Sequence, residues 1–334
     1  MIRGNRRARQ PVRDVWTRER LVHERAVALG NVIDRSTLSN YSSALNSYLN
    51  FVKLHDLPVE PTPETLSFYT VYMSHHINPR SVNTYLLGIS QQLETHFPTV
   101  KAARNSTLVR RTWQGCMRVR GTATIRKRAL TTDDLQLVIT HYQNSTLHDG
   151  LLFVAMLITG FFGLLRLGKL TFPDEPSLRN WKKVKRRNTV TIRDNVYEFT
   201  LPGHKADGYF EGNKIIIPAS CFNLNPLHHF ASYINSRDMI HPVASPLWLT
   251  EDGMVPTRSF FITRLRLFFR NDVAGQSMRA GGATALAEHG VSPAIIQASG
   301  RWASEAFLVY ICKNPTLLQG FLYATTGSSS SLPA

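Results

Sequence analysis

Four short segments of the chain carry side chains that could do chemistry, and two of them contain an arginine that could bind an anion. Arg166 ends the apolar segment 151–165, and a buried arginine is costly unless it pairs with a carboxylate or binds an anion. Arg279 stands at the predicted start of a helix, where free backbone N–H groups also favour a phosphate. Taken alone, Arg166 is explained better by a structural salt bridge than by an anion site.

Lys205 and Tyr310 are the other two candidates. Segment 202–207 is predicted to be a turn that presents Lys205, and an exposed turn lysine is its simplest explanation. The neighbouring His204 could assist Lys205 or only shape the turn. Tyr310 shares a predicted helix face with Phe307 and Ile311, so a core or interface role is the ordinary expectation for this one of 11 tyrosines.

The second half of the chain supplies the elements that must position these residues. Thr131 to Asp134 form a strong helix-start signal, and a buried central helix is predicted over about 150–170. Two β-branched, alternating stretches predict a small antiparallel sheet with a turn at Asp194–Asn195. Gly281 and Gly282 would let a neighbouring backbone pack closely. Further helices are predicted at 226–237, 257–270, 278–289, 293–298 and 304–312.

The first half, from about 21 to 125, is predicted to be a small all-α domain. Ser36 or Thr37 is the expected cap of its first helix, a second helix is expected over 62–75, and a third near Pro79. The first helix has one apolar face with three- and four-residue spacing, made of Leu38, Tyr41, Ala44, Leu45, Tyr48, Leu49 and Val52.

Composition points to a folded protein with a polyanionic partner. The chain has 334 residues, a net charge of +16 and a hydrophobic content of 43%. Such a charge favours DNA, RNA or an anionic membrane surface as partner. The apolar segment 151–165 is shorter than the ~20 residues that span a bilayer, and no secretory signal is visible. The three cysteines form neither a disulfide framework nor a metal-binding pattern.

The basic residues are concentrated in two segments. Residues 1–20 form a basic arm that could be a solubilising tail, a phosphate-contacting arm or a nuclear-import signal. Segment 98–131 contains no Asp or Glu, so we expect this predicted interdomain segment to lie along a phosphate backbone. Its basic residues are Lys101, Arg104, Arg110, Arg111, Arg118, Arg120, Arg126, Lys127 and Arg128.

The set of candidates is more specific than any one of them. Arg166, Lys205, Arg279, Trp302 and Tyr310, in this order, resemble the signature of the tyrosine recombinase (phage integrase) family. The strings RAGGATALAEHG, IIQASGRW and FLVYI most resemble recombinases of eukaryotic mobile elements such as fungal crypton-like transposons. The resemblance covers nearly the whole chain.

The resemblance implies a role for each residue. Arg166 and Arg279 would grip the scissile phosphate and stabilise its developing charge without a metal. Tyr310 would attack the phosphorus and form a 3′-phosphotyrosyl bond, and Lys205 would protonate the leaving 5′-oxygen. Trp302 would pack near the nucleophile and donate its indole N–H to a phosphate oxygen, a role that Arg301 could share.

Two positions depart from the family pattern. Gln276 stands where the second motif usually has histidine, and Lys169 where the first usually has glutamate. A glutamine can donate a hydrogen bond to phosphate but cannot transfer a proton. The two changes could be coupled, since a neutral glutamine needs no carboxylate partner. They could equally mark a catalytically impaired, DNA-binding derivative.

The sequence therefore predicts a mainly α protein: a helical core-binding domain, then a mixed, mostly α catalytic domain with a small antiparallel sheet. Its boundaries are an arm at 1–20, a DNA clamp at 21–125, a catalytic domain at 126–325 and a disordered tail at 326–334. The expected activity is site-specific DNA recombination for a mobile element, in the nucleus, by a tetramer on two double-stranded DNA sites. An RNA-binding protein is a more distant alternative that rests on charge alone. No cofactor, metal or membrane is expected. The expected DNA-binding residues are Arg104, Arg110, Arg111, Arg118, Arg120, Arg126, Lys127, Arg128, His204 and Arg301.

Overall fold

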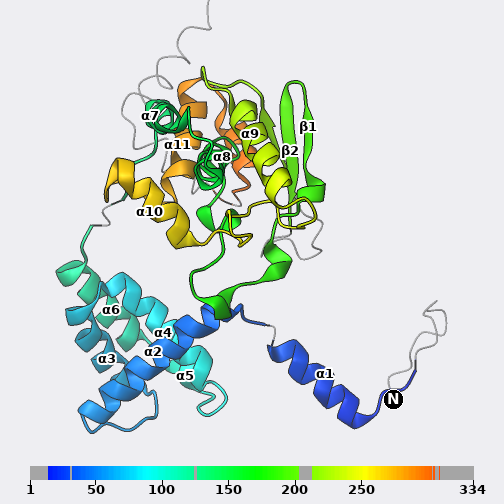
Figure 1. Ribbon diagram of the computed structural model, residues 1–334. Coiled ribbons are helices and arrows are strands. Elements are labelled where there is room, and N and C mark those ends of the chain that lie inside the picture. Colours follow the sequence, from blue (N-terminus) through cyan, green and yellow to red (C-terminus); the bar gives the residue numbers. More distant parts are fainter. Residues whose placement is uncertain are drawn as a thin grey trace, which may run out of the picture. The chain divides into compact units, whose positions relative to one another are not determined.

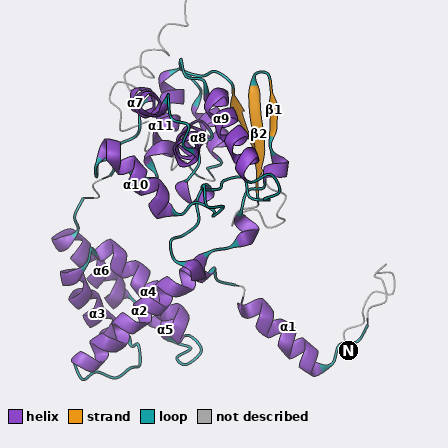
Figure 2. Ribbon diagram, in the orientation of Figure 1, coloured by secondary structure: helices purple, strands orange, loops and turns teal. Residues whose placement is uncertain are grey.

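A computed structural model describes residues 14–30, 32–123, 126–202, 213–302, 304 and 308. The chain divides into two compact units, residues 1–124 and 125–334. The described elements are mostly helices, with one small antiparallel sheet in the second unit (Figure 2). The predicted fold class is thereby confirmed.

The N-terminal unit consists of helices. They are α1 (Arg18–Gly30), α2 (Arg35–Leu54), α3 (Pro63–His76), α4 (Pro79–Leu93), α5 (Val100–Arg104) and α6 (Thr107–Arg120). The predicted starts of α3 and α4 are confirmed, because Thr62 and Asn78 cap these helices and Pro63 and Pro79 occupy their first positions. Helix α1 has no buried residue.

The core of this unit lies where α2, α3, α4 and α6 meet. Tyr48 and Tyr69 are fully buried and pack edge to face, with ring centroids 5.6 Å apart. Helices α2 and α4 approach closely at Gly88, where a Cβ atom would lie 3.0 Å from the Cβ of Ala44. The predicted apolar face of α2 is only partly buried, because Leu38 and Leu49 are exposed.

The C-terminal unit is built around α8 (His148–Phe162), which lies among α7 (Thr132–Tyr142), α9 (Pro226–Ile240) and α11 (Ser277–Glu288) (Figure 1). Twelve of the 15 residues of α8 are buried, as predicted for a central helix. Thr131 and Asp134 form a capping box at the start of α7, which confirms the predicted start signal. No helix among the described residues is long and apolar enough to cross a bilayer.

The sheet has three antiparallel strands in the order β1 (Thr191–Arg193), β2 (Val196–Leu201) and β3 (Asn213–Pro218). Phe199 pairs with Ile215 in the register of β2 and β3. Tyr197 stacks on Phe230 of α9 with ring centroids 4.1 Å apart, so the sheet packs against that helix. The remaining helices are α10 (Arg258–Phe269) and α12 (Pro293–Gly300), with short 3-10 turns at Leu167–Lys169, Pro176–Leu178, Trp181–Lys183 and Arg187–Thr189.

Three predictions about elements were wrong. Helix α1 begins at Arg18, inside the arm predicted for residues 1–20, and α2 begins at Arg35 after Asp34, before Ser36 and Thr37. Helix α8 ends at Phe162, because the chain turns there and Leu164 takes a positive φ of 50°. The basic segment 98–131 contains α5 and α6, which agrees with the predicted all-α domain up to about residue 125. Most of the predicted helix 304–312, all of it except residues 304 and 308, and the tail lie outside the described residues.

Candidate functional site

Arg279 is the centre of the candidate site. It lies in the first turn of α11, as predicted, and its side chain is buried. Its Nη1 donates to the carbonyl oxygen of Leu164 at 2.7 Å, and its Nη2 donates to that of Gly300 at 2.6 Å. Its guanidinium carbon lies 3.9 Å from the centre of the Trp302 ring. Arg279 therefore links the turn before Arg166 to the turn before Trp302.

Both of these turns include a residue in a left-handed conformation. Leu164 has a φ of 50° and Arg301 a φ of 57°, and neither is a glycine. Such conformations cost about 1 kcal/mol or more and persist where the surroundings hold them. Arg301 contributes to this, because its Nη2 donates to the carbonyl oxygen of Gly163 at 2.7 Å. The two arginines thus bind neighbouring carbonyls of one turn.

Arg166 follows that turn directly and has an exposed side chain. Among the described residues, Arg166 therefore does not form the buried structural salt bridge that was the alternative explanation for it. The carbonyl of Arg166 accepts a hydrogen bond of 2.7 Å from the backbone N–H of Lys169, so both side chains belong to one 3-10 turn. Leu167 of this turn packs against Gly275, where a Cβ atom would lie 2.5 Å from the leucine Cδ2.

Gln276 sits next to that contact, at the N-terminal cap of α11, and its side chain is exposed. The structure therefore places Arg166, Lys169, Gln276, Arg279 and Trp302 on adjoining turns. The close packing predicted for Gly281 and Gly282 is confirmed. Cβ atoms on them would lie 2.1 Å from the carbonyl oxygens of Leu130 and Phe161. Tyr310, Lys205 and His204 lie outside the described residues.

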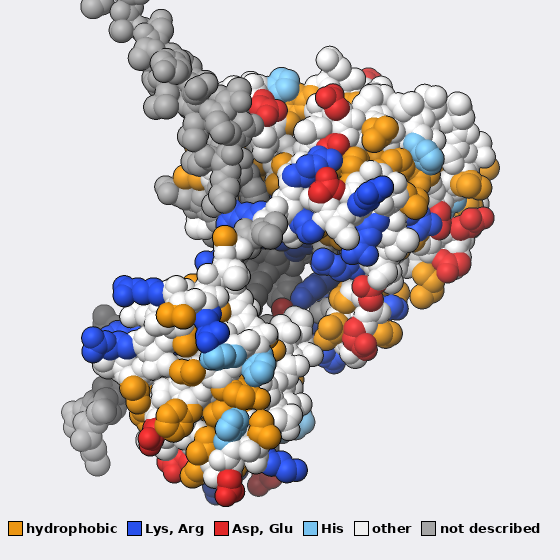
Figure 3. Space-filling view, turned by 90° about the vertical axis from the view of Figure 1, so that its left-hand side faces the viewer, with side chains coloured by type: hydrophobic (Ala, Val, Ile, Leu, Met, Phe, Trp, Pro, Cys, Tyr) orange, Lys and Arg blue, Asp and Glu red, His pale blue; other side chains and the backbone are white. Residues whose placement is uncertain are grey.

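Positive charge accumulates around these turns. Burial lowers the pKa of Arg301 to about 10, with the charge of Arg166 adding to the effect. Burial also lowers the pKa of Lys169, as do the nearby charges of Lys183, Arg166 and Arg301. Such mutual repulsion would be relieved by a bound anion. On the face that Figure 3 shows, Lys and Arg side chains gather on the C-terminal unit.

One further cation in this region was missed by the sequence analysis. Lys185 is only 6% exposed, and burial, with the charge of Lys169, lowers its pKa to about 7. In the sequence it belongs to the basic run KKVKRR at 182–187, which gives no sign that one member is buried.

The basic residues predicted to contact DNA differ in their surroundings. Arg110, Arg111, Arg118 and Arg120 all have exposed side chains on α6. Arg104 donates to the Oδ1 of Asn83 at 3.3 Å, and Arg126 is exposed. Lys101 is paired with Glu94, and Lys127 donates to the carbonyl oxygen of Asn271.

Arg128 has two carboxylate partners. Its Nη2 donates to the Oδ1 of Asp134 and its Nε to the Oδ2 of Asp272, each at 3.0 Å. These bonds join the start of α7 to the segment after α10, and they hold the pKa of Asp134 and of Asp272 below the usual range. This arrangement favours a structural role for Arg128 over the predicted phosphate contact.

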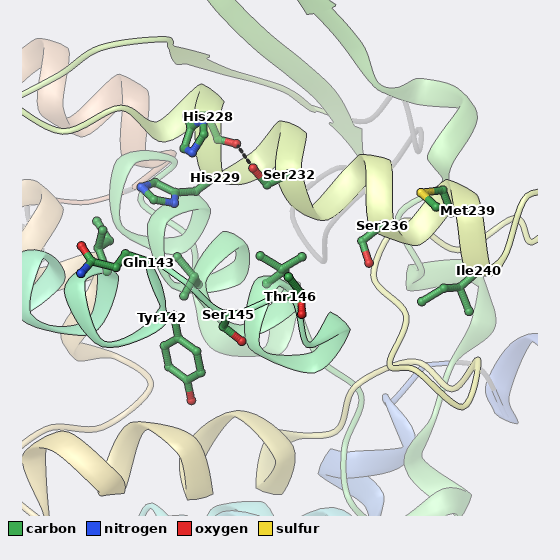
Figure 4. A pocket seen from close by; sticks show the side chains of 13 residues that line it. Tyr142, Gln143, Ser145, Thr146, His228, His229, Ser232, Ser236, Met239 and Ile240 are labelled. Atoms are coloured by element: carbon green, nitrogen blue, oxygen red, sulfur yellow. Dashed lines mark hydrogen bonds between the residues drawn. The ribbon is translucent and has the colours of Figure 1, made fainter.

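A pocket of about 560 Å³ lies elsewhere in the C-terminal unit, lined by α7, α8 and α9 (Figure 4). His228 and His229 are on its wall, and their rings are 5.2 Å apart at 77° to one another. Burial and the charge of His228 lower the pKa of His229 to about 4. Within the described part of the chain, no group of three metal-ligating side chains is found.

Comparisons with known proteins agree on the fold. The Tn1549 transposon integrase in complex with circular intermediate DNA matches with a TM-score of 0.57 and 14% identity, over 92% of this chain and 98% of that one. The XerH site-specific recombinase bound to palindromic difH substrate matches with 0.55 and 12%, over 84% and 79%. A lambda integrase dimer bound to a COC′ core site matches with 0.53 and 14%, over 95% and 98%. The chain has the tyrosine recombinase fold. No family model and no curated protein matches its sequence.

Proposed function

We propose that this protein is a site-specific DNA recombinase that cuts and rejoins double-stranded DNA through a 3′-phosphotyrosyl intermediate. One observation carries the proposal. Arg279 is bonded both to the turn before Arg166 and to the turn before Trp302, so three residues of the resemblance adjoin on a tyrosine recombinase fold. They come from segments that are far apart in the sequence.

The cations of the site would bind a phosphodiester and stabilise its transition state. Arg166 is exposed and adjoins Arg279, so the two guanidinium groups can share a phosphate whose phosphorus becomes five-coordinate. The two bonds from Arg279 to carbonyls use two of its five N–H groups and fix the plane of the guanidinium. This preorganisation lowers the cost of binding charge in the transition state.

Tyr310 would be the nucleophile. Its Oη would lose its proton to solvent and form a bond to phosphorus while the bond from phosphorus to the 5′-oxygen breaks. Lys205 would supply the proton that the leaving oxygen needs. Rejoining is the reverse, because the phosphotyrosyl bond retains the energy of the phosphodiester. Gln276 would donate a hydrogen bond to a phosphate oxygen in place of a histidine.

The exposed arginines of α6 would hold the DNA backbone. Arg111 and Arg118 are seven residues apart, so they lie on one face of the helix about two turns from each other. Seven residues of helix span about 10 Å, so the two side chains could contact non-adjacent phosphates of one backbone, and such contacts give affinity without sequence readout. Arg104, Arg110, Arg120, Arg126 and Lys127 are the remaining candidates for this role.

The biological setting is part of the same proposal. The strings around Arg279 and Tyr310 resemble recombinases of eukaryotic mobile elements, which suggests integration or excision of such an element in the nucleus. We further propose a tetramer on two DNA sites. Light scattering that finds only a monomer, with and without cognate DNA, would argue against the tetramer.

Covalent trapping tests the proposed activity. The protein is incubated with DNA from the ends of its element that carries a nick near the cleavage point, and a denaturing gel separates the products. We expect a DNA-linked protein band that disappears in Tyr310→Phe and falls at least about a hundredfold in Arg279→Ala. Retarded DNA on a native gel without a covalent band would favour a DNA-binding derivative that has lost strand exchange.

A further inference from the structure

Lys185 is a buried lysine at the edge of the candidate site. It lies between the 3-10 turns Trp181–Lys183 and Arg187–Thr189 and is 6% exposed. Its backbone is fixed, because its carbonyl oxygen accepts a hydrogen bond of 2.7 Å from the backbone N–H of Leu247. Lysine is almost never fully buried without a partner of opposite charge. The position of this side chain therefore calls for an explanation.

Among the described residues, the charged neighbour that acts on Lys185 is a cation. Lys169 is close enough for its charge to lower the pKa of Lys185. Lys169 itself is close to Lys183, Arg166 and Arg301, whose charges lower its pKa. We call Arg166, Lys169, Lys183, Lys185 and Arg301 the cation cluster.

The described carboxylates leave three members of this cluster unbalanced. Arg187, two residues after Lys185, pairs with Asp238 at 2.6 Å. The same carboxylate also pairs with Arg237 at 2.9 Å, so Asp238 already has two cationic partners. Among the residues that the structure describes, no carboxylate pairs with Lys185, Lys169 or Arg166. These three side chains therefore hold more positive charge than their described surroundings offset.

We propose that Lys185 is a further residue of the phosphate-binding site, which takes up a proton when a DNA phosphate enters the cation cluster and then helps to hold that phosphate. This inference rests on the proposed function, because it requires DNA as the ligand. The step is a proton transfer in which a hydronium ion or a buffer acid loses the proton, its bond to that proton breaks, and the lone pair of Nζ forms the new N–H bond.

The physical reason is the balance of charge in the site. In the empty protein, burial and the charge of Lys169 disfavour the ammonium form, so the pKa of Lys185 is about 7. A phosphate places a negative charge beside the same cations. This charge favours the ammonium form of Lys185 and raises its pKa toward the value in water. When no phosphate is bound, neutral Lys185 reduces the repulsion among the cations of the site. When a phosphate is bound, protonated Lys185 adds its positive charge to theirs.

Calorimetry of DNA binding tests this idea. A nicked duplex is titrated into the full chain at pH 8, in buffers that differ in ionisation enthalpy, so that the proton uptake on binding is measured. We expect the wild-type protein to take up as much as about one proton per bound site in excess of Lys185→Met. Its affinity should fall by up to about tenfold per pH unit between about pH 7 and 9, because binding is linked to protonation.

Lys182→Met is the matched control, because Lys182 is an exposed lysine of the same segment. It removes one positive charge and should keep the proton uptake of the wild type. Lys185→Arg, which carries a permanent charge, should bind DNA without the extra uptake. These variants separate the titration of Lys185 from the general effect of losing a cation.

The outcomes are distinct. Tight DNA binding with equal proton uptake in the wild type and in Lys185→Met would overturn the role of Lys185 and leave the recombinase proposal intact. If the wild-type protein binds DNA at pH 8 without taking up protons, the proposed role of Lys185 is wrong, whatever the variants show. Failure of the wild-type protein to bind any duplex would overturn both proposals.

Discussion

The guanidinium of Arg279 lies 3.9 Å from the centre of the Trp302 ring, and the same side chain donates to the carbonyl oxygen of Gly300 two residues earlier. The ring in turn covers Gly300, because a Cβ atom there would lie 1.5 Å from the Trp302 Cζ3. Trp302 is thus fixed by an arginine on one side and a glycine on the other. The ring therefore restricts the orientation of the guanidinium plane, which in the proposed function binds the phosphate.

The first prediction concerns this stacking. Trp302→Ala should slow covalent adduct formation roughly threefold to thirtyfold, because a partly buried cation–π contact contributes about 0.5–2 kcal/mol. Trp302→Phe retains a ring face and should lose less. Single-turnover trapping on nicked DNA measures both rates, and DNA affinity on a native gel should change little. A Trp302→Ala variant that reacts at the wild-type rate would show that the stacking has no role in the reaction.

The second prediction concerns the packing of α11 on α8. Gly282→Ala should destabilise the C-terminal unit, because the new Cβ atom would lie 2.1 Å from the carbonyl oxygen of Phe161. Overpacking of this kind costs about 1–3 kcal/mol, and each kcal/mol lowers the midpoint of thermal unfolding by roughly 2–4 °C. Differential scanning calorimetry measures the change.

Gly115→Ala is the control for that experiment. Gly115 is also inside a helix, but a Cβ atom added there would have no neighbour within 4 Å. Alanine is about 0.5–1 kcal/mol better than glycine at such a position, so the midpoint of the N-terminal unit should rise. Equal effects of the two substitutions would contradict the packing described for α11.

The third prediction concerns two basic residues, Arg118 and Arg128, for which the sequence analysis predicted the same DNA-binding role. Arg118→Gln should reduce the slope of log affinity for DNA against log salt concentration by about 1, because one phosphate contact is lost. Arg128→Gln should leave that slope nearly unchanged, since Arg128 is held by Asp134 and Asp272. Fluorescence anisotropy over a range of salt concentrations measures both slopes. A larger loss for Arg128 than for Arg118 would reverse the assignment.

The fourth prediction concerns pH and stability. The pKa of Lys185 is lowered to about 7 in the folded protein, below the value of 10.5 for a free lysine. The unfolded chain therefore binds more protons between these values, and the stability contributed at this site rises with pH across that window. Lys185→Met should be more stable than the wild type below pH 7, and the difference should shrink as the pH approaches 10.5. Denaturant unfolding at several pH values measures it, and a difference independent of pH would contradict the lowered pKa.

Much of the fold follows from local sequence signals. The start of α3 near Thr62, the start of α7 near Thr131 and the turn at Asp194–Asn195 depend on a few adjacent residues, and each was predicted. The end of α8 was not, because Gly163 after Phe162 has an ordinary negative φ of −80°, and the left-handed turn falls on Leu164, a residue type that does not signal one. That conformation is held instead by Arg279 and Arg301, which lie more than a hundred residues away.

The candidate site likewise has features that could be predicted from the sequence and others that depend on distant contacts. The order and context of Arg166, Arg279 and Trp302 could be recognised in the sequence, and the structure brings their turns together. The burial of Lys185 and the carboxylate partners of Arg128 could not be foreseen. Both depend on contacts with Leu247, Asp272 and other residues that are distant in the chain.

The most direct test of the proposed chemistry is to identify the amino acid that becomes linked to DNA. Protein trapped on nicked DNA is digested with nuclease and protease, and mass spectrometry locates the residual nucleotide on the peptide. We predict a single modified site, a phosphodiester on Tyr310, which is absent when Arg166 is replaced by Ala. An adduct on another residue, or none despite specific binding of the same DNA, would contradict the proposal that this chain exchanges DNA strands through Tyr310.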